Sequence, residues 1–352
     1  MRMKILYLGS DHGTSKHRAD ALIRLGHQIE LIDPRACIAG IPLTGPWQRY
    51  LGSVGLAAKV KAGILSRVKS SRFDLAWVDS GALVSPSLVH ALKGIAGRVI
   101  NLNLDDPYGN RDVNLWAQYR AAVSEYNLVV VVREENVAEA RALNAKRVLR
   151  IYRSADEVAH APRALTSEEK AKWSSDVLFV GTAFPERGTF FRDLVRLGVP
   201  LSIYGNKWSE LKEWNAIKQC WKGPGLEDAY SYSTGILASK ISLGLLSKEN
   251  RDLHTTRSME IPSMGAVFCA ERTSEHLHLY KEDEEAVFWN SPEECAAKCA
   301  ALLADDDWRR SVAARGHERY LRNGWTNMQV AKAILQEAFE CSEALAGVRI
   351  TS

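Results

Sequence analysis

The sequence lacks long hydrophobic runs. No uninterrupted apolar stretch approaches the roughly 20 residues that a membrane-spanning helix requires. The first apolar run reaches Gly9 after a few residues, which is typical of a first β-strand and not of a secretory signal. We therefore expect a cytoplasmic chain that is neither exported nor inserted across a membrane.

Cysteine is also sparse, with six residues and no C-x-x-C pair. Only Cys295 and Cys299 lie close together, at the i,i+4 spacing of a helix. A zinc site built on these two and on His276 or His278 would lack the rest of a metal-ligand pattern. The sequence therefore predicts reduced structural thiols and no metal.

A strong charge excess is missing as well. The chain has 46 lysines and arginines against 42 acidic residues, a net charge of +4. It shows neither the aromatic RNA-binding signature nor a zinc-finger pattern, which argues against nucleic acid as a partner. No G-x-G-x-x-G follows the first strand, so a nicotinamide dinucleotide site has little support.

One stretch concentrates basic residues on a helical pattern. Apolar residues recur at helical spacing from Leu56 to Val68. The basic residues that accompany them are Lys59, Lys61, Arg67, Lys69 and Arg72. Such a helix could touch the anionic surface of the inner membrane or a lipid-linked acceptor. A helix that packs on its own domain and exposes a solvated basic face is the favoured interpretation.

An internal repeat predicts the architecture. The segments that begin at Lys4 and at Asp176 each read as strand, glycine, polar loop, helix, glycine and strand. In both, a second glycine follows the first by seventeen residues, from Gly9 to Gly26 and from Gly181 to Gly198. The second glycine stands where a left-handed helix C-cap is expected. Two β-α-β starts predict two α/β domains, each with a parallel sheet.

Further strands are expected in both halves, at residues 75–78, 99–102, 128–132 and 148–151 of the first and 177–180, 201–204, 241–246, 266–270 and 286–288 of the second. We predict domains at residues 1–160 and 170–327, and a C-terminal helix within 328–352 that could cross back to the first domain. The polar stretch from Ser154 to Ser175 is the expected linker.

The block from Asp252 to Glu275 is the most informative. Asp252 and Glu260 are separated by seven residues, so on one helix both carboxylates and Arg257 would share a side. A carboxylate suits ribose hydroxyls, and a guanidinium suits a diphosphate. The alternative is an ordinary surface ion pair between Arg257 and Glu260.

A family resemblance shifts this balance. The run RSMEIPSMG from Arg257, followed by AERT from Ala270 and EEAVF from Glu284, resembles the C-terminal block of CgeB-like (spore maturation protein) glycosyltransferases. Their wider relatives are retaining transferases with a Glu-x7-Glu motif. The resemblance implies a GT-B fold, in which two Rossmann-like domains face each other across a cleft, and no essential metal.

The resemblance also implies residue roles. Glu260 would hold the ribose of the donor, Arg257 and Lys240 its phosphates, and Gly181 with Thr182 the donor side of the cleft. The remaining candidates for donor binding are Arg187, Gly205, Asn206 and Gly265. Asp252 replaces the first glutamate of the motif, so its catalytic role near the donor sugar and the retaining outcome stay open.

The first half offers three further catalytic candidates. Asp105 and Asp106 end an apolar strand, where they could orient or deprotonate an acceptor hydroxyl. They could equally form a turn before Pro107, and a metal-binding Asp-x-Asp is a weaker alternative. His12 lies in the loop after the first strand and could be a base, although loop histidines are more often solvated or capping.

The sequence thus predicts a glycosyltransferase that moves a sugar from a nucleotide-diphosphate sugar, its co-substrate, to an acceptor hydroxyl. The acceptor would be a saccharide, a lipid-linked molecule or a protein in the assembly of cell-surface glycans, glycolipids or glycoproteins. The alternatives are a nucleotide-sugar epimerase of the same fold and a non-catalytic nucleotide-sugar binding protein. The nucleotide, the sugar, the acceptor and the stereochemistry depend on pocket shape.

Overall fold

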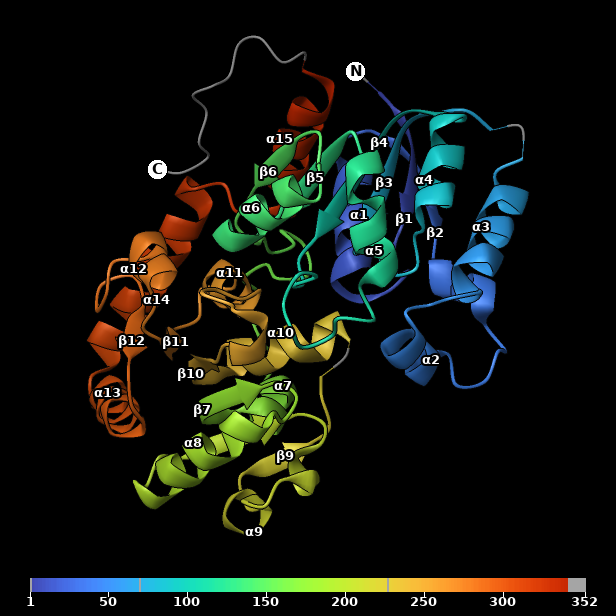
Figure 1. Cartoon of the computed structure of the whole chain (residues 1–352). Coiled ribbons are helices and arrows are strands. Elements are labelled where there is room, and N and C mark those ends of the chain that lie inside the picture. The colour runs from blue at the N-terminus through green and yellow to red at the C-terminus, as the bar shows by residue number, and fades with distance from the viewer. Residues whose placement is uncertain (1, 70, 227, 341–352) are drawn as a thin grey trace. The chain divides into compact units, whose positions relative to one another are not determined.

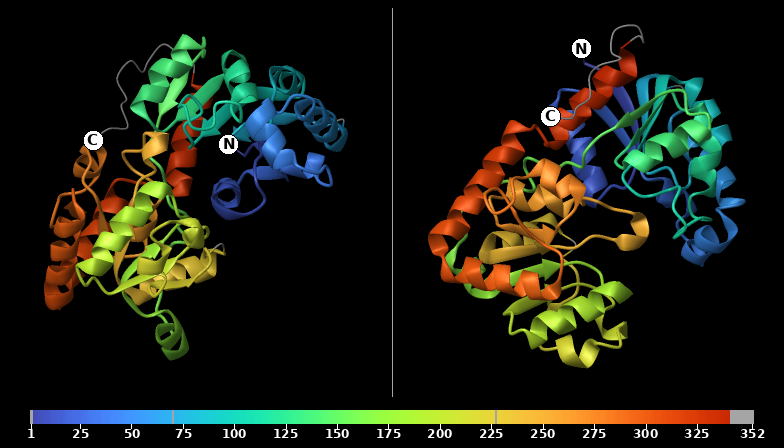
Figure 2. Two further views of the ribbon diagram at one scale, coloured as in Figure 1. Left: turned by 60° about the horizontal axis from the view of Figure 1, so that its bottom comes forward. Right: turned by 60° about the vertical axis from the view of Figure 1, so that its left-hand side comes forward.

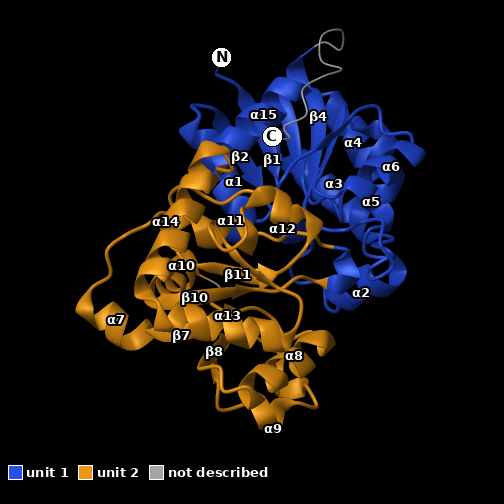
Figure 3. Ribbon diagram, turned by 90° about the vertical axis from the view of Figure 1, so that its left-hand side faces the viewer, with its two compact units in different colours: residues 1–153, 248–251, 327–352 blue, residues 154–247, 252–326 orange. Residues whose placement is uncertain are grey.

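The chain folds around two parallel β-sheets of six strands each (Figure 1). The computed structural model describes residues 2–69, 71–226 and 228–340. It divides into two compact units (Figure 3). The first unit takes in the residues up to Arg153, the short segment Lys248–Arg251 and the residues from Asn327 onward, and the second unit takes in the rest.

The first unit contains a sheet in the order β2-β1-β3-β4-β5-β6. Its strands are β1 (Lys4–Leu8), β2 (Gln28–Ile32), β3 (Phe73–Asp79), β4 (Ala96–Asn103), β5 (Leu128–Val131) and β6 (Val148–Arg150). Its helical elements are α1 (Gly13–Arg24), η1 (Pro34–Ile38), α2 (Thr44–Leu51), α3 (Leu56–Arg67), α4 (Pro86–Lys93), α5 (Ala117–Ala122), η2 (Val123–Glu125), α6 (Glu134–Ala142), η4 (Lys248–Asn250) and α15 (Asn327–Phe339). Residues of α3, α4 and α5 pack on one face of the sheet, and residues of α1 and α15 pack on the other.

The second unit contains a sheet in the order β12-β11-β10-β7-β8-β9. Its strands are β7 (Ser175–Val180), β8 (Leu201–Tyr204), β9 (Trp221–Gly223), β10 (Ser239–Gly244), β11 (Phe268–Glu271) and β12 (Val287–Trp289). Its helical elements are α7 (Ser167–Trp173), α8 (Pro185–Arg196), η3 (Trp208–Glu210), α9 (Trp214–Ile217), α10 (Ala229–Ala238), α11 (Arg257–Ser263), α12 (Ser274–Leu279), α13 (Pro292–Ala304) and α14 (Asp306–Arg322). Residues of α8 and α13 form one core with the strands.

The predicted repeat is confirmed, because α1 and α8 end in the same C-cap hydrogen bond. Gly26 and Gly198 both adopt positive φ, +90° and +78°, directly after their helices. The residue after each glycine donates to the carbonyl five positions earlier, from His27 to Leu22 and from Val199 to Leu194. This is the hydrogen bond of a Schellman cap. Glycine is needed here because other residues avoid the left-handed region, so both helices end at the same point of the motif.

Two segments differ from the simple two-part division. The stretch expected to be a linker contains α7, which a capping box of Thr166 and Glu169 begins. The sequence shows this signal as a threonine followed three residues later by glutamate. The short segment Lys248–Arg251, which follows β10 in the chain, belongs to the first unit. Nothing in the local sequence of that segment indicates this.

The C-terminal helix α15 packs on the first unit. It lies beside α1 (Figure 2), and its buried residues Ile334 and Leu335 join the core around Tyr7 and Trp77. The basic helix α3 likewise buries its apolar side chains in the core of the first unit. The favoured interpretation, that α3 packs on its own domain, is therefore confirmed for the apolar face of the helix. None of the described helices is both long and apolar enough to cross a membrane.

Candidate functional site

The loops at the carboxyl ends of β7 and β8 come into unusually close contact. Gly181 follows β7 and Gly205 follows β8, and the Trp208 indole nitrogen donates to the Gly181 carbonyl at 3.0 Å. A Cβ atom on Gly205 would lie 1.9 Å from the Gly181 carbonyl oxygen, so only glycine fits. In parallel sheets ligands bind beyond these strand ends, and a bare backbone lets a ligand approach closely.

Arg187, on the first turn of α8, holds two neighbouring loops together. Its guanidinium donates to the Thr182 carbonyl at 2.7 Å and to the Leu246 carbonyl at 3.2 Å. It also lies over the ring of Phe184, with 4.5 Å between the guanidinium carbon and the ring centroid. Arg187 is buried. Its hydrogen bonds link the loops after β7 and β10, and direct contact of Arg187 with the donor stays a prediction.

Arg257, Tyr232 and Glu260 meet near the end of β7. The Arg257 guanidinium donates to the Val180 carbonyl at 3.4 Å and lies 5.5 Å from the centroid of the Tyr232 ring. The Tyr232 hydroxyl, on α10, donates to Glu260 Oε2 at 2.7 Å, and His160 Nε2 lies 3.7 Å from Glu260 Oε1. Burial and the charge of Glu260 raise the pKa of Tyr232 well above its usual range. Tyr232 therefore remains a hydrogen-bond donor at neutral pH.

Arg257 is partly buried and forms no salt bridge with any described carboxylate. Some other partly buried arginines are paired with carboxylates, whereas Arg120 donates to the Pro107 and Val113 carbonyls. Arg18 binds Asp79, and Arg272 binds Glu282 and Glu294. Removing a guanidinium from water without a counter-ion is costly. Burial alone would lower the pKa of Arg257, but the charges of Tyr232 and Glu260 raise it. The Glu260 carboxylate thus acts on Arg257 electrostatically without forming a salt bridge with it.

Sequence reasoning missed Tyr232 and His160. Tyr232 precedes Glu260 by 28 residues and His160 precedes it by a hundred. No spacing rule links positions that far apart. Only the packing of α10 and of the segment before α7 against α11 brings them to Glu260.

The expected single helix through Asp252 and Glu260 is wrong. α11 begins at Arg257, and Asp252 lies in the irregular segment before it, although it is buried. Residues 252–256 do not continue the helix backward, and the Ser258 hydroxyl accepts from the Thr255 backbone there. The geometric argument that placed both carboxylates on one side of a helix therefore fails, whereas Arg257 and Glu260 do share one.

Two predicted donor residues lie at the amino ends of strands, opposite the ends where the loops after β7 and β8 meet. Lys240 is the second residue of β10 and pairs with Asp176, at the start of β7, at 2.8 Å. Gly265, with φ +71°, ends α11 before β11 begins. Both positions are at amino ends of strands, so we leave them out of the candidate site.

Asn206 is exposed after β8 and accepts from the Gly225 backbone at 3.2 Å.

In the first unit, Asp106 is engaged on both carboxylate oxygens. Arg251 donates to Oδ2 at 2.6 Å and to Oδ1 at 2.7 Å, and Asn136 donates to Oδ1 at 3.0 Å. Burial alone would raise the pKa of Asp106, but the hydrogen bonds from Arg251 and Asn136 lower it below its usual value. This geometry makes Asp106 an anchor for Lys248–Arg251 and a poor base.

The other two catalytic candidates are exposed. Asp105 follows β4, and its backbone amide donates to Asn103 Oδ1 at 2.9 Å. His12 precedes α1, and its Nδ1 lies 2.9 Å from Asp11 Oδ1. Both follow the carboxyl ends of strands in the first unit. Both are accessible to a substrate, and His12 has a carboxylate partner in Asp11.

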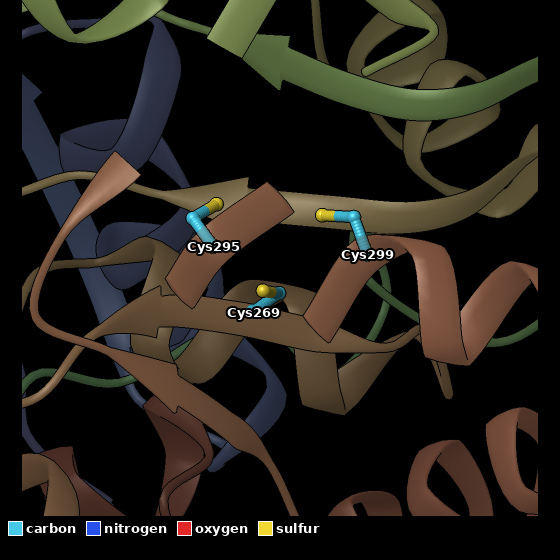
Figure 4. Close-up of side chains that lie close together, drawn as sticks. All are labelled: Cys269, Cys295 and Cys299. Atoms are coloured by element: carbon cyan, nitrogen blue, oxygen red, sulfur yellow. The ribbon is translucent and has the colours of Figure 1, made fainter. Parts of the chain in front are cut away.

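The described residues contain one group that could hold a metal, a thiol cluster formed by Cys269, Cys295 and Cys299 (Figure 4). Their Sγ atoms lie within 4.8 Å of one another, and all three side chains are buried in the core between β11 and α13. Among the described residues no histidine or carboxylate joins them. The cluster is surrounded by apolar side chains, so it packs as part of the core.

A family model described as glycosyl transferase-like matches residues 187–336. Among solved structures, sucrose-phosphate synthase from Thermosynechococcus elongatus is similar with a TM-score of 0.68 and 11% identity, over 96% of this chain and 98% of that chain. HepE from Anabaena, solved in complex with UDP-glucose, is similar with a TM-score of 0.65 and 13% identity, over 96% and 99%.

A glycosyltransferase from Rickettsia africae is also similar, with a TM-score of 0.62 and 13% identity, over 97% of this chain and 100% of that chain. The chain has the GT-B fold. No curated protein matches its sequence. The family match covers the segment that contains Arg187, Arg257 and Glu260, and together with the fold it supports a glycosyltransferase, as expected from the sequence.

Proposed function

We propose that the protein is a glycosyltransferase of the CgeB-like type and that its second unit binds a nucleotide-diphosphate sugar. The observation that carries this proposal is Arg257, a partly buried guanidinium without a salt bridge at the carboxyl end of β7. A diphosphate would supply the missing anion through bidentate hydrogen bonds. HepE, which has the same fold, has been solved in complex with UDP-glucose.

The neighbouring groups suit the rest of such a donor. The Glu260 carboxylate accepts one bond from Tyr232, and a carboxylate has lone pairs left for two vicinal ribose hydroxyls. Gly181 and Gly205 follow the carboxyl ends of β7 and β8, where a ligand of a parallel sheet is expected to bind. In this arrangement Arg257 stabilises the charge that develops on the departing diphosphate, which is where a fixed cation accelerates group transfer.

The first unit would then present the acceptor hydroxyl. Asp105 and His12 are the candidates to orient it, because both are exposed after strand ends, whereas Asp106 is held by Arg251. We infer that no metal is needed, since the Arg257 guanidinium would offset part of the charge of the diphosphate. Transfer activity that persists in excess EDTA would agree with this inference, and activity that needs added Mg²⁺ or Mn²⁺ would contradict it.

Thermal shift with UDP, GDP, dTDP and CDP tests the proposal. A ligand at 100 times its dissociation constant stabilises the folded state by about 2.7 kcal/mol. We expect a shift with one nucleotide for the wild type, and none for Glu260→Ala at the same concentration. Arg196→Ala is the matched control, because Arg196 is 71% exposed near the end of α8.

The outcomes separate the alternatives. A shift with no nucleotide would contradict donor binding. A shift that survives in Glu260→Ala would contradict the role of Glu260. A transferase should consume the nucleotide sugar only when an acceptor is present, whereas an epimerase should convert it without one. Binding of the nucleotide sugar without any consumption would indicate a non-catalytic binding protein.

A further inference from the structure

One segment of the first unit carries the basic excess of the whole chain. Residues 34–73 include seven lysines and arginines and no aspartate or glutamate. The chain has 46 basic and 42 acidic residues, so 39 basic residues face 42 acidic ones outside this segment. The segment comprises η1, α2, α3 and the turns around them (Figure 1).

The lysines of this segment lack partners. Lys59 and Lys69 are exposed and Lys61 is partly exposed. None of the three forms an ion pair with a described carboxylate. The apolar side of α3 is buried in the core, so the helix cannot insert elsewhere, but its charges remain free to meet an anionic surface.

The most exposed large apolar side chains of the described residues lie in the same segment. Leu43 is 75% exposed, Tyr50 71% and Val54 67%, and Leu51, at the end of α2, is 60% exposed. Leu43 also adopts a left-handed φ of 57°, which is unfavourable for a bulky residue. Neither burial nor backbone preference explains a leucine there, and apolar side chains gathered this way mark interaction surfaces.

A cavity of about 620 Å³ lies beside these residues. Its lining is mixed, with apolar Ile38, Ile41 and Pro46 and the charged Arg35 and Arg49. The Arg49 guanidinium lies 3.8 Å from Asp112. A cavity with both apolar walls and guanidinium groups matches the chemistry of a phospholipid, which presents phosphate next to hydrocarbon.

We propose that residues 34–73 dock the protein on an anionic phospholipid bilayer. The apolar side chains of residues 43–54 enter the headgroup region, and the lysines and arginines contact lipid phosphates. Apolar insertion and attraction to anionic lipids together give binding that either one alone does not sustain. A second copy of the chain is a poorer occupant, because two such basic surfaces repel each other.

Co-sedimentation of the full-length protein with vesicles tests this proposal. Vesicles of phosphatidylcholine with about one-third phosphatidylglycerol are compared with pure phosphatidylcholine. We expect binding to the anionic vesicles alone, weakened in about 0.5 M NaCl because salt screens charges beyond a few ångströms. Each basic side chain near the surface contributes about a fivefold factor in affinity. Lys59→Gln/Lys61→Gln should therefore weaken binding about 25-fold.

Matched control variants show whether vesicle binding depends on residues 34–73 or only on the number of charged and apolar side chains that are exposed. Lys218→Gln/Lys222→Gln removes two exposed lysines of the second unit and should leave vesicle binding unchanged. Leu43→Asn/Leu51→Asn should weaken binding at least tenfold. Asn tolerates the left-handed backbone at position 43, so folding should be preserved. The control is Leu277→Ser/Leu321→Ser, at leucines 47% and 52% exposed in the second unit.

Several results would overturn the proposal. These are equal binding to neutral and anionic vesicles, no binding to either, or equal losses in the surface and control variants. A wild-type dimer that Leu43→Asn/Leu51→Asn converts to a monomer, without any loss of vesicle binding, would assign the surface to a second copy. The nucleotide thermal shift of each variant shows that it is folded, and it tests the proposed donor site separately.

Discussion

Replacing Arg257 by alanine should weaken binding of a nucleoside diphosphate without weakening the fold. The guanidinium makes one long hydrogen bond of 3.4 Å and no salt bridge with a described carboxylate, so little stability depends on it. A hydrogen bond to a charged group contributes about 1.5–3 kcal/mol. At about 1.4 kcal/mol for each factor of ten, the dissociation constant should rise about 10- to 150-fold.

The assay is isothermal titration of the wild type and of Arg257→Ala with the nucleoside diphosphate that thermal shift selects. The same titrations with the matching nucleoside, which carries no phosphate, provide the internal comparison. Because Arg257 is assigned to the diphosphate, the variant should lose affinity for the diphosphate and bind the nucleoside as the wild type does. Arg257→Lys keeps the charge but loses the bidentate geometry. Its affinity for the nucleoside diphosphate should therefore lie between that of the wild type and that of Arg257→Ala.

Two results would refute this reasoning. An equal loss of affinity for nucleoside and diphosphate would mean that Arg257 only shapes the site. An unchanged affinity for both would mean that the anion for Arg257 is something else. Arg196→Ala is the control, because Arg196 is a solvent-exposed arginine of the same unit.

Three further predictions concern the scaffold. Arg251→Ala should destabilise the protein by about 1–3 kcal/mol, because the buried Asp106 carboxylate loses its two charged hydrogen bonds and keeps those from Asn136 and Gly109. Since folding lowers the pKa of Asp106, its contribution is present above about pH 4 and is lost as the pH falls. Urea unfolding should therefore show a gap between wild type and variant that narrows in acid, and a pH-independent gap would contradict the pairing. Gly205→Ala should lower the Tm sharply, because its Cβ would overlap a carbonyl oxygen, whereas Gly225→Ala should be mild; equal melting temperatures would contradict the close approach. The thiol cluster should resist alkylation in the native protein and react fully in denaturant, and peptide mapping by mass spectrometry that found it labelled natively would show that the core opens there.

Local sequence patterns are enough to predict the two parallel sheets. Alternating strand and helix patterns are local, and the paired glycines at Gly26 and Gly198 mark helix ends through a backbone conformation that other residues avoid. All nine strand ranges and the first strand could be placed this way to within a few residues. The short edge strand β9 was missed, because three residues carry too little pattern to detect.

The composition of the candidate site depends on long-range packing that no local pattern reveals. Arg257 and Glu260 could be predicted as a pair because three residues on a helix are local. Tyr232 and His160 reach Glu260 only through the packing of separate elements, and Lys240 is excluded because it stands at the amino end of its strand. Asp106 and Arg251 show the same principle, since they are 145 residues apart in the chain. Sequence spacing specifies which residues share an element, and the fold decides which elements meet.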